Sequence, residues 1–326
     1  MDKYKHKYKY KKSLFRIPLF LCLFFSISAC YKVPNKIEPK LSYNCKAQEL
    51  KNFSHTFPPL TPSEKKSDWG TEYTIALTFA KKLDLYRAIS TFERADILVP
   101  AENAERKEAI EYYILLCYYL AQRYDTLLDY FQTSELHHVD KSFLAFEDLL
   151  IILYESYLQT GQKEEAVKIQ MMIQEHYPET ATKLKLSAAL IDADFQTLQA
   201  LEKNPSLDFI PPFLDNYESK KKSITKAKLL NILPGAGYLY LGQHRSALTA
   251  FLINGLFIFA TYEFFHNGYT AAAIITLSFE VGWYFGGING AGEEAKFYNE
   301  QLYQKEASAL MQKEKLFPFF SLKYTF

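Results

Sequence analysis

The sequence carries almost no net charge. Its 38 basic and 37 acidic residues leave a formal charge of +1 at pH 7. Seven Lys or Arg and one Asp lie in the first 16 residues, a local charge of +6, so the remainder is mildly acidic at about −5. A mildly acidic chain gives no reason to expect nucleic acid as a ligand.

Several patterns that carry chemistry are missing. The glycines of Pro234–Gly242 follow no predicted strand and precede no Lys-Ser or Lys-Thr pair, so no phosphate loop is expected. His137, His138 and Asp140 lack a further ligand at zinc spacing. No serine or cysteine nucleophile stands near a base in the helical region. We therefore predict a protein that is not an enzyme and holds no metal or cofactor.

The start of the chain has the pattern of an export signal. Residues 1–16 are basic, and Ile17–Ala29 is an apolar run of 13 residues, which suits a signal peptide and is short for a membrane span. The quartet Ile27, Ser28, Ala29 and Cys30 resembles the bacterial lipoprotein box, which implies lipidation of Cys30. The alternative is an ordinary signal or an uncleaved anchor. Tyr31, instead of Asp, favours the outer membrane.

If Cys30 is acylated and Cys22 leaves with the signal peptide, only Cys45 and Cys117 remain as thiols. An exported compartment permits a disulfide between them. Cys117 lies in an apolar helical run, where a buried free thiol is the commoner outcome. The pairing stays open.

The next segment, residues 30–67, is rich in proline and has little periodicity. Such composition is typical of a semi-extended tether. We expect it to hold the following module away from the membrane.

A helical repeat begins at Trp69. If Trp69 is position 1, small residues recur at positions 8, 20 and 27, aromatic residues at 11 and 24, and proline at 32. Small residues let paired helices approach, and proline ends the second helix. These residues, which resemble the tetratricopeptide (TPR) signature, are Ala76, Phe79, Ala88, Phe92, Ala95 and Pro100.

Weaker copies begin near Glu108 and Glu147. The resemblance to tetratricopeptide proteins covers residues 68–205. It implies a stack of helix pairs with a groove that binds a protein or peptide. The alternative is a helical bundle without a groove.

The stretch that organises the chain is residues 229–299. Two apolar runs, Ala247–Tyr262 and Tyr269–Ile288, flank a polar turn at Glu263–Gly268. About 20 residues cross a bilayer, so the second run is long enough and the first is marginal. The fold class predicted is all-α, a TPR-like solenoid followed by a two-helix transmembrane hairpin.

The second run contains small and polar residues at informative positions. Gly282, Gly286 and Gly290 recur every four residues, which predicts one face for helix packing in lipid. Glu280 is costly in a membrane without a partner, and Asn254 in the facing run is one candidate. These residues are either part of a polar pathway or interhelical contacts.

The hairpin also resembles a small uncharacterised bacterial membrane family. The resemblance rests on a Pro-Gly-x-Gly-x-x-Tyr-x-Gly start, Pro234–Gly242, and an Ala-Lys-x-Tyr-Asn end, Ala295–Asn299. No catalytic residues follow from it.

Two further segments complete the chain. The linker 206–228 carries five lysines, which can hold anionic headgroups. A lipidated N-terminus would place them outside the cytoplasm, against the positive-inside preference. Residues 300–326 are a charged helix and a tail whose Phe320, Leu322, Tyr324 and Phe326 alternate like a strand, a hint of outer-membrane targeting.

Together these features predict an envelope lipoprotein with its soluble module facing the periplasm. It would act as a protein-interaction scaffold, contacting a protein or peptide partner and membrane lipid. The alternatives are an oligomeric channel or transport component built from the hairpin, and a secreted effector that inserts the hairpin in a host membrane.

Overall fold

The fold of the described residues is helical throughout. The structure is a computed structural model, and it describes residues 33–326 except 44, 47, 53–54 and 203. These residues form α-helices, short 3-10 helices and an isolated bridge between His55 and Tyr324, without a strand. The predicted all-α fold class with a C-terminal hairpin is confirmed.

The chain divides into two compact units. One contains the described residues up to Pro39 together with Phe209–Glu306, and we call it the hairpin unit. The other contains Lys40–Asp208 together with Ala307–Phe326, and we call it the helix-pair unit. Each unit therefore combines segments that lie far apart in the sequence.

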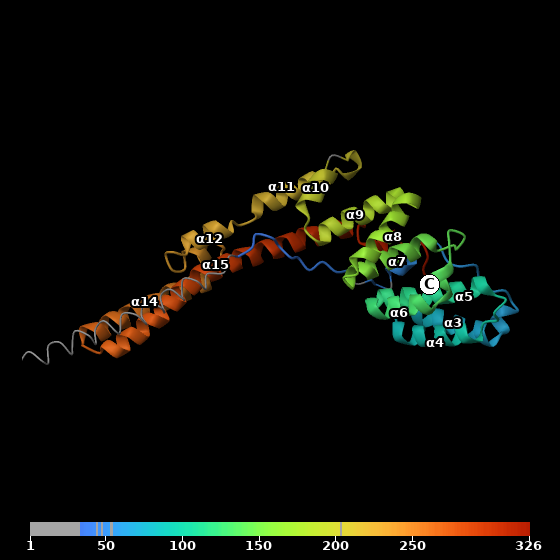
Figure 1. Cartoon of the computed structure of the whole chain (residues 1–326), viewed down its shortest axis with the longest axis horizontal. Helices are drawn as coiled ribbons and strands as arrows, with labels where there is room; N and C mark the ends of the chain where they lie inside the picture. Colours follow the sequence, from blue (N-terminus) through green and yellow to red (C-terminus); the bar gives the residue numbers. More distant parts are fainter. Residues whose placement is uncertain (1–32, 44, 47, 53–54, 203) are drawn as a thin grey trace, which may run out of the picture. The chain divides into compact units, whose positions relative to one another are not determined.

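The helix-pair unit holds four successive pairs of helices within its described residues (Figure 1). Each second helix packs against the first helix of the next pair. The pairs are α3 (Asp68–Ala80) with α4 (Leu85–Leu98), α5 (Ala104–Leu120) with α6 (Tyr124–Thr133), α7 (Phe146–Gln159) with α8 (Lys163–His176), and α9 (Pro178–Ile191) with α10 (Phe195–Leu201).

The turn inside each pair is closed by a residue with a positive φ angle. The N–H of the following residue donates to a carbonyl five residues earlier, the bond that ends a helix in a Schellman motif. The same local geometry therefore reverses the chain four times. The turn residues are Leu83 (57°), Gln122 (56°), Gly161 (75°) and Ala193 (50°).

The spacing of these turns departs from the tetratricopeptide pattern. Leu83, Gln122 and Gly161 recur every 39 residues, whereas that repeat has 34. The connection between α6 and α7 is long and contains the 3-10 helix η3 (Glu135–His138). The helix pairing is thus observed, and the repeat class stays a prediction.

The first helices of the central pairs are buried on every side. Ile110 and Tyr112–Cys117 on α5, and Leu149–Leu153 on α7, are at most 2% exposed. A helix that is apolar all round needs cover on all faces. Part of that cover comes from outside the helix pairs, from residues 50–60 and from the C-terminal tail.

The described residues between 40 and 67 belong to the helix-pair unit, whereas the sequence predicts a semi-extended tether. Leu50, Phe57 and Leu60 belong to its core. The segment contains the short helices η1 (Glu49–Asn52) and η2 (Glu64–Lys66). Burial of apolar surface contributes about 25 cal/mol of stabilising free energy per Å², which favours packing of these side chains against the core.

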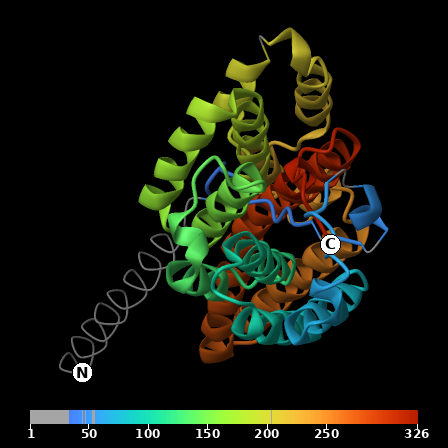
Figure 2. The same cartoon turned by 90° about the vertical axis from the view of Figure 1, so that its right-hand side faces the viewer.

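The C-terminal tail also returns to this core. Its residues 318–321 form the 3-10 helix η5 (Pro318–Ser321), and Phe319, Leu322 and Phe326 are buried. The C-terminus lies among the helices of its own unit in both views (Figures 1 and 2). The alternating apolar residues therefore serve packing within a helical unit.

The hairpin unit is built on α14 (His244–His266) and the 44-residue α15 (Thr270–Lys313), which runs on into the other unit. The hydroxyls of Thr261 and Thr276 are 3.0 Å apart, so the two helices lie side by side. Both are long and apolar enough to cross a membrane. The turn between them is Asn267–Tyr269, shorter than predicted because α14 continues through His266.

Three short helices precede the hairpin: α11 (Ile210–Lys220), α12 (Ile224–Leu230) and α13 (Ala236–Tyr240). Between α12 and α13, the buried Asn231 accepts the N–H groups of Gly235 and Gly237, each at 3.1 Å. A Cβ at Gly237 would lie 2.4 Å from the carbonyl oxygen of Ala227. These glycines therefore permit a close approach of the backbone to α12 and to Asn231.

Candidate functional site

The strongest candidate site is the surface formed by the first helices of the pairs. Helix α5 contacts α7, and η5 of the tail contacts both α7 and α9. In a stack of helix pairs, this is the surface on which a peptide groove is expected. Here the protein's own tail occupies it.

The tail is held through its backbone. The N–H groups of Lys323 and Tyr324 donate to the carboxylate of Asp148 at 2.7 and 2.6 Å. The hydroxyls of Tyr112 and Tyr113 donate to the carbonyl oxygens of Tyr324 and Thr325, each at 3.1 Å. This recognition reads main-chain groups, which every extended peptide offers.

A second strand-like contact lines the opposite side of the tail. The N–H of His55 donates to the carbonyl oxygen of Lys323, and the N–H of Thr325 donates to that of His55, both at 3.2 Å. The tail is thus enclosed between residues 55–57 and the helices. An extended segment in this position pairs in the manner of an added strand.

Aromatic rings hold the side chains of the tail. Phe326 packs against Tyr113 with ring centroids 5.4 Å apart. Phe57 contacts Tyr324 at 5.2 Å, Tyr112 at 5.5 Å and Tyr113 at 5.3 Å. These contacts favour an aromatic residue at the end of the bound segment.

Asp148 is the central polar group of this site. It is 1% exposed, and its Oδ2 accepts from Lys323, Tyr324 and, at 3.2 Å, from the Tyr112 hydroxyl. Its Oδ1 has no hydrogen-bond partner among the described residues. Burial raises the pKa of Asp148 to about 6, although the three donors oppose that rise.

An ion pair adds to the same anchor. The Lys323 ammonium lies 2.5 Å from the carboxylate of Glu147, which also accepts from Thr180 at 2.6 Å. Glu147 and Asp148 begin α7, where negative charge suits the helix N-terminus. The start of α7 is therefore prepared for both the backbone and the lysine of the tail.

The predicted repeat signature lies mostly in the core. Ala76, Ala88, Phe92 and Ala95 are fully buried between α3, α4 and α5. Phe79 is partly buried, and the Arg87 guanidinium lies 4.9 Å from its ring centroid. Pro100 follows the end of α4 and is exposed. These residues hold the helix pairs together and do not form the surface that holds the tail.

The three predicted packing glycines have different surroundings. A Cβ at Gly290 would lie 2.7 Å from the hydroxyl of Tyr238, so Gly290 packs within the unit. A Cβ at Gly282 or Gly286 would meet no described atom within 4 Å. The face around those two glycines is open, and their role in helix association stays a prediction.

Asn254 and Glu280 both lie inside the hairpin unit, at 4% and 7% exposure. Asn254 donates to the carbonyl oxygen of Ala250 at 2.6 Å. Within the described chain, the Asn254 carbonyl oxygen and one Glu280 oxygen have no hydrogen-bond partner. The expected bond between the two residues is therefore not formed.

The linker lysines have partners inside the hairpin unit. Lys220 lies 3.1 Å from Glu306, and Lys228 lies 3.0 Å from the Asn289 amide oxygen. The Lys222 ammonium stands 4.9 Å from the Tyr240 ring centroid. These contacts fasten the linker, and headgroup binding stays a prediction.

The remaining predictions concern metal binding, a disulfide and lipidation. His137 and His138 lie on η3, and the described residues contain no cluster of three metal-ligating side chains. Cys45 and Cys117 are free thiols. Cys30 with its motif Ile27, Ser28 and Ala29 lies outside the described residues.

The sequence predictions missed the residues that hold the tail. Tyr112, Tyr113, Glu147 and Asp148 stand in otherwise apolar helical stretches. Polar groups in fully buried helices need hydrogen-bond partners. Polar residues inside apolar helical stretches could therefore have indicated buried hydrogen bonds. They do not reveal which segment of the chain supplies the partners.

Comparisons with known proteins found no match. No family model matches the chain, and searches of characterised proteins and of solved structures found no match either. The resemblances to bacterial lipoproteins, to tetratricopeptide proteins and to the glycine-rich membrane family therefore stay predictions.

Proposed function

We propose that the protein is a non-catalytic, membrane-anchored scaffold of the bacterial cell envelope. In this proposal the hairpin lies in a bilayer, and the helix-pair unit binds an extended segment of a partner protein. The tail then acts as an occupant of the same site within the chain. The observation that carries the proposal is the recognition of the tail backbone by Asp148, Tyr112 and Tyr113.

The membrane part of the proposal rests on exposed apolar side chains. On α14 they recur along the whole helix, each more than half exposed, and a bilayer is the solvent in which such a surface is stable. These residues are Leu248, Phe251, Leu252, Leu256, Ile258 and Phe259. Lipidation of Cys30 would add a second anchor and put the helix-pair unit in the periplasm, on the outer membrane.

The proposed binding site is tested with the tail supplied as a separate peptide. A chain that ends at Leu316 is expected to bind a labelled peptide of residues 317–326, whereas the intact chain binds it at least about tenfold more weakly because its own tail competes. Fluorescence anisotropy in detergent measures both affinities.

Substitutions at Asp148 sharpen this test. Asp148→Ala in the shortened chain leaves the peptide N–H groups unpaired and should weaken binding by about tenfold or more. Asp148→Asn keeps an acceptor oxygen and serves as the control. Equal peptide affinity of the intact and shortened chains, or an Asp148→Ala variant that binds normally while its melting temperature is unchanged, would count against the site.

A second candidate is an oligomeric membrane component. The open face at Gly282 and Gly286, together with the unpaired oxygens of Asn254 and Glu280, favours it. Glu280→Gln is then expected to alter ion permeability of vesicles that contain the protein. If permeability stayed unchanged across a range of protein densities, the scaffold would be the only proposed function left.

A further inference from the structure

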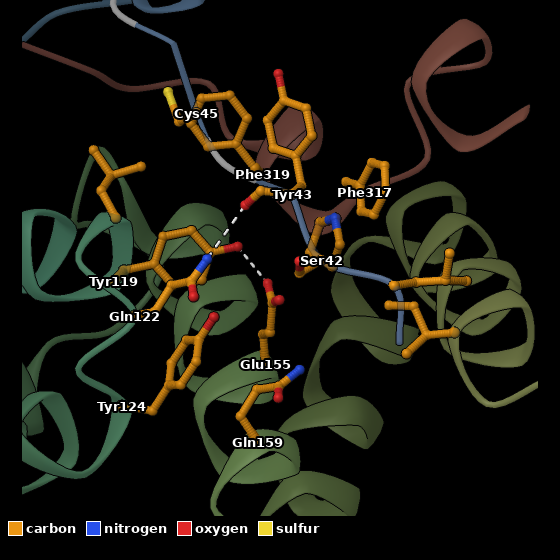
Figure 3. Close-up of a pocket in the computed structure, with 14 residues that line it drawn as sticks. Ser42, Tyr43, Cys45, Tyr119, Gln122, Tyr124, Glu155, Gln159, Phe317 and Phe319 are labelled. Carbon is orange, nitrogen blue, oxygen red and sulfur yellow. Dashed lines mark hydrogen bonds between the residues drawn. The ribbon is translucent and has the colours of Figure 1, made fainter. Parts of the chain in front are cut away.

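A pocket of about 110 Å³ opens beside Glu155 in the helix-pair unit (Figure 3). The helices contribute Tyr119, Tyr124 and Glu155 to its lining. Residues 41–43 and 45 form one wall, and the tail forms another. A cavity of ~150 Å³ holds benzene, and one water needs ~10–15 Å³. The pocket therefore suits a group of a few heavy atoms.

Aromatic rings form much of the wall. Tyr119 and Tyr124 meet edge to face with centroids 6.3 Å apart. Tyr43 stacks on Phe317 at 5.0 Å and on Phe319 at 5.6 Å. Aromatic rings present negative charge on their faces and attract cations, with tyrosine among the better groups.

Glu155 supplies the only formal charge in the lining. The Tyr119 hydroxyl donates to one of its oxygens (Figure 3). Among the fourteen described residues that line the pocket, none is Lys or Arg. Burial raises the pKa of Glu155 to about 7, and the Tyr119 hydroxyl partly opposes that rise. The ionised carboxylate therefore lacks a positive partner in the pocket.

The chemistry of the lining narrows the ligand class. Calcium takes six to eight oxygen ligands and magnesium six, more than one carboxylate and a few hydroxyls or amides supply here. An anion would meet the Glu155 carboxylate. A neutral apolar group would bury that carboxylate without a new partner.

We propose that this pocket binds a small organic cation, a methylated ammonium group held between the Glu155 carboxylate and the rings of Tyr119 and Tyr124. The site goes beyond the scaffold function and does not depend on it. Because Phe317 and Phe319 belong to the tail, the pocket is complete only while the tail is docked. Ligand binding must then stabilise the docked tail by linkage.

Calorimetric titration of the intact chain with tetramethylammonium chloride tests the proposal. Sodium chloride at equal ionic strength and the neutral analogue neopentyl alcohol are the reference ligands. Tetramethylammonium is expected to bind at least about tenfold more tightly than neopentyl alcohol, because a desolvated cation gains from both the carboxylate and the rings. It should also raise the melting temperature.

Two substitutions complete the experiment. Glu155→Gln keeps the shape and the acceptor for Tyr119 but removes the charge, and it should weaken binding by about tenfold. Glu111→Gln is the matched control, because burial likewise raises the pKa of Glu111 to about 7 and Glu111 lies outside the pocket lining. The proposal would be overturned if neopentyl alcohol bound as tightly as tetramethylammonium, or if Glu155→Gln left tetramethylammonium binding unchanged. It would also be overturned if tetramethylammonium chloride produced no more heat than sodium chloride.

Discussion

At the scale of single residues, one residue with a positive φ angle closes the turn inside each helix pair. Only Gly161 of the four turn residues lacks a Cβ, and an added Cβ there would meet no described atom within 4 Å. The strain of a positive φ angle is thus the only energetic cost of adding a Cβ at position 161.

Gly161→Ala is expected to lower the free energy of unfolding by about 1 kcal/mol, since an L-residue at φ near +75° is strained. Ala193→Gly, at φ +50°, relieves the same strain and should not destabilise the protein by more than a few tenths of a kcal/mol. Chemical denaturation monitored by circular dichroism compares the two. A Gly161→Ala variant as stable as the parent would contradict the turn geometry.

The raised pKa of Glu155 predicts that the stability of the fold depends on pH. Its pKa is raised from 4.5 to about 7 in the folded chain, so folding favours the neutral form. The stability that this preference provides is complete below pH 4.5 and is lost as pH rises toward 7. The loss is on the order of 3 kcal/mol at most, since one pKa unit corresponds to ~1.4 kcal/mol.

Glu155→Gln should therefore gain stability relative to the parent as pH rises from 5 to 8. Melting temperatures of both proteins across that range measure the difference. A difference that stays constant with pH would show that Glu155 titrates normally.

At the scale of elements, the hairpin separates two kinds of glycine. Gly237 and Gly290 approach other groups of their own unit, whereas Gly282 and Gly286 face open space. Small residues on an exposed helix face permit close helix association in lipid. In the proposed oligomer, a second copy contacts α15 at these two open glycines.

Gly286→Leu is expected to abolish self-association and to leave the hairpin folded, because a Cβ at this position would meet no described atom within 4 Å. Gly255→Leu on α14 is the matched control, since Gly255 is equally open. Crosslinking in membranes, with dilution into lipid, measures the oligomer. If both variants associate like the parent, the glycine face has no part in assembly.

At the scale of the whole molecule, the proposed function divides anchoring between the hairpin and a lipid at Cys30. The proposal treats the two anchors as independent, because α14 and α15 are long and apolar enough to cross a bilayer without an acyl chain. One acyl group alone gives only reversible membrane binding, whereas a helical hairpin gives stable insertion.

Cys30→Ala is accordingly expected to stay in the membrane pellet after alkaline extraction, while the parent shows the added mass of the acyl chains at its N-terminus. A chain without residues 244–288 should remain membrane-bound only when Cys30 is present. Release of the Cys30→Ala protein by extraction would contradict the assignment of the hairpin to the bilayer.

Local patterns in the sequence predicted much of the architecture. The helical period that begins at Trp69 and the two apolar runs of the hairpin both depend on residues close together in the chain. Periodicity and length express the geometry of one helix, so they can be read without a three-dimensional structure. Even there, the predicted turn at Glu263–Gly268 began too early. Helix α14 continues through His266, because polar residues alone do not end a helix.

Local patterns of residues therefore suffice to define an all-α chain with paired helices and a long apolar hairpin. The position of the tail on α5 and α7, the bond from Asp148 to its backbone and the aromatic pocket beside Glu155 became visible only in the folded chain. Asp148 and Tyr324 lie 176 positions apart in the sequence, and no local pattern links them. Such contacts arise because fully apolar helices need cover, and which segment supplies it depends on the packing of the whole unit.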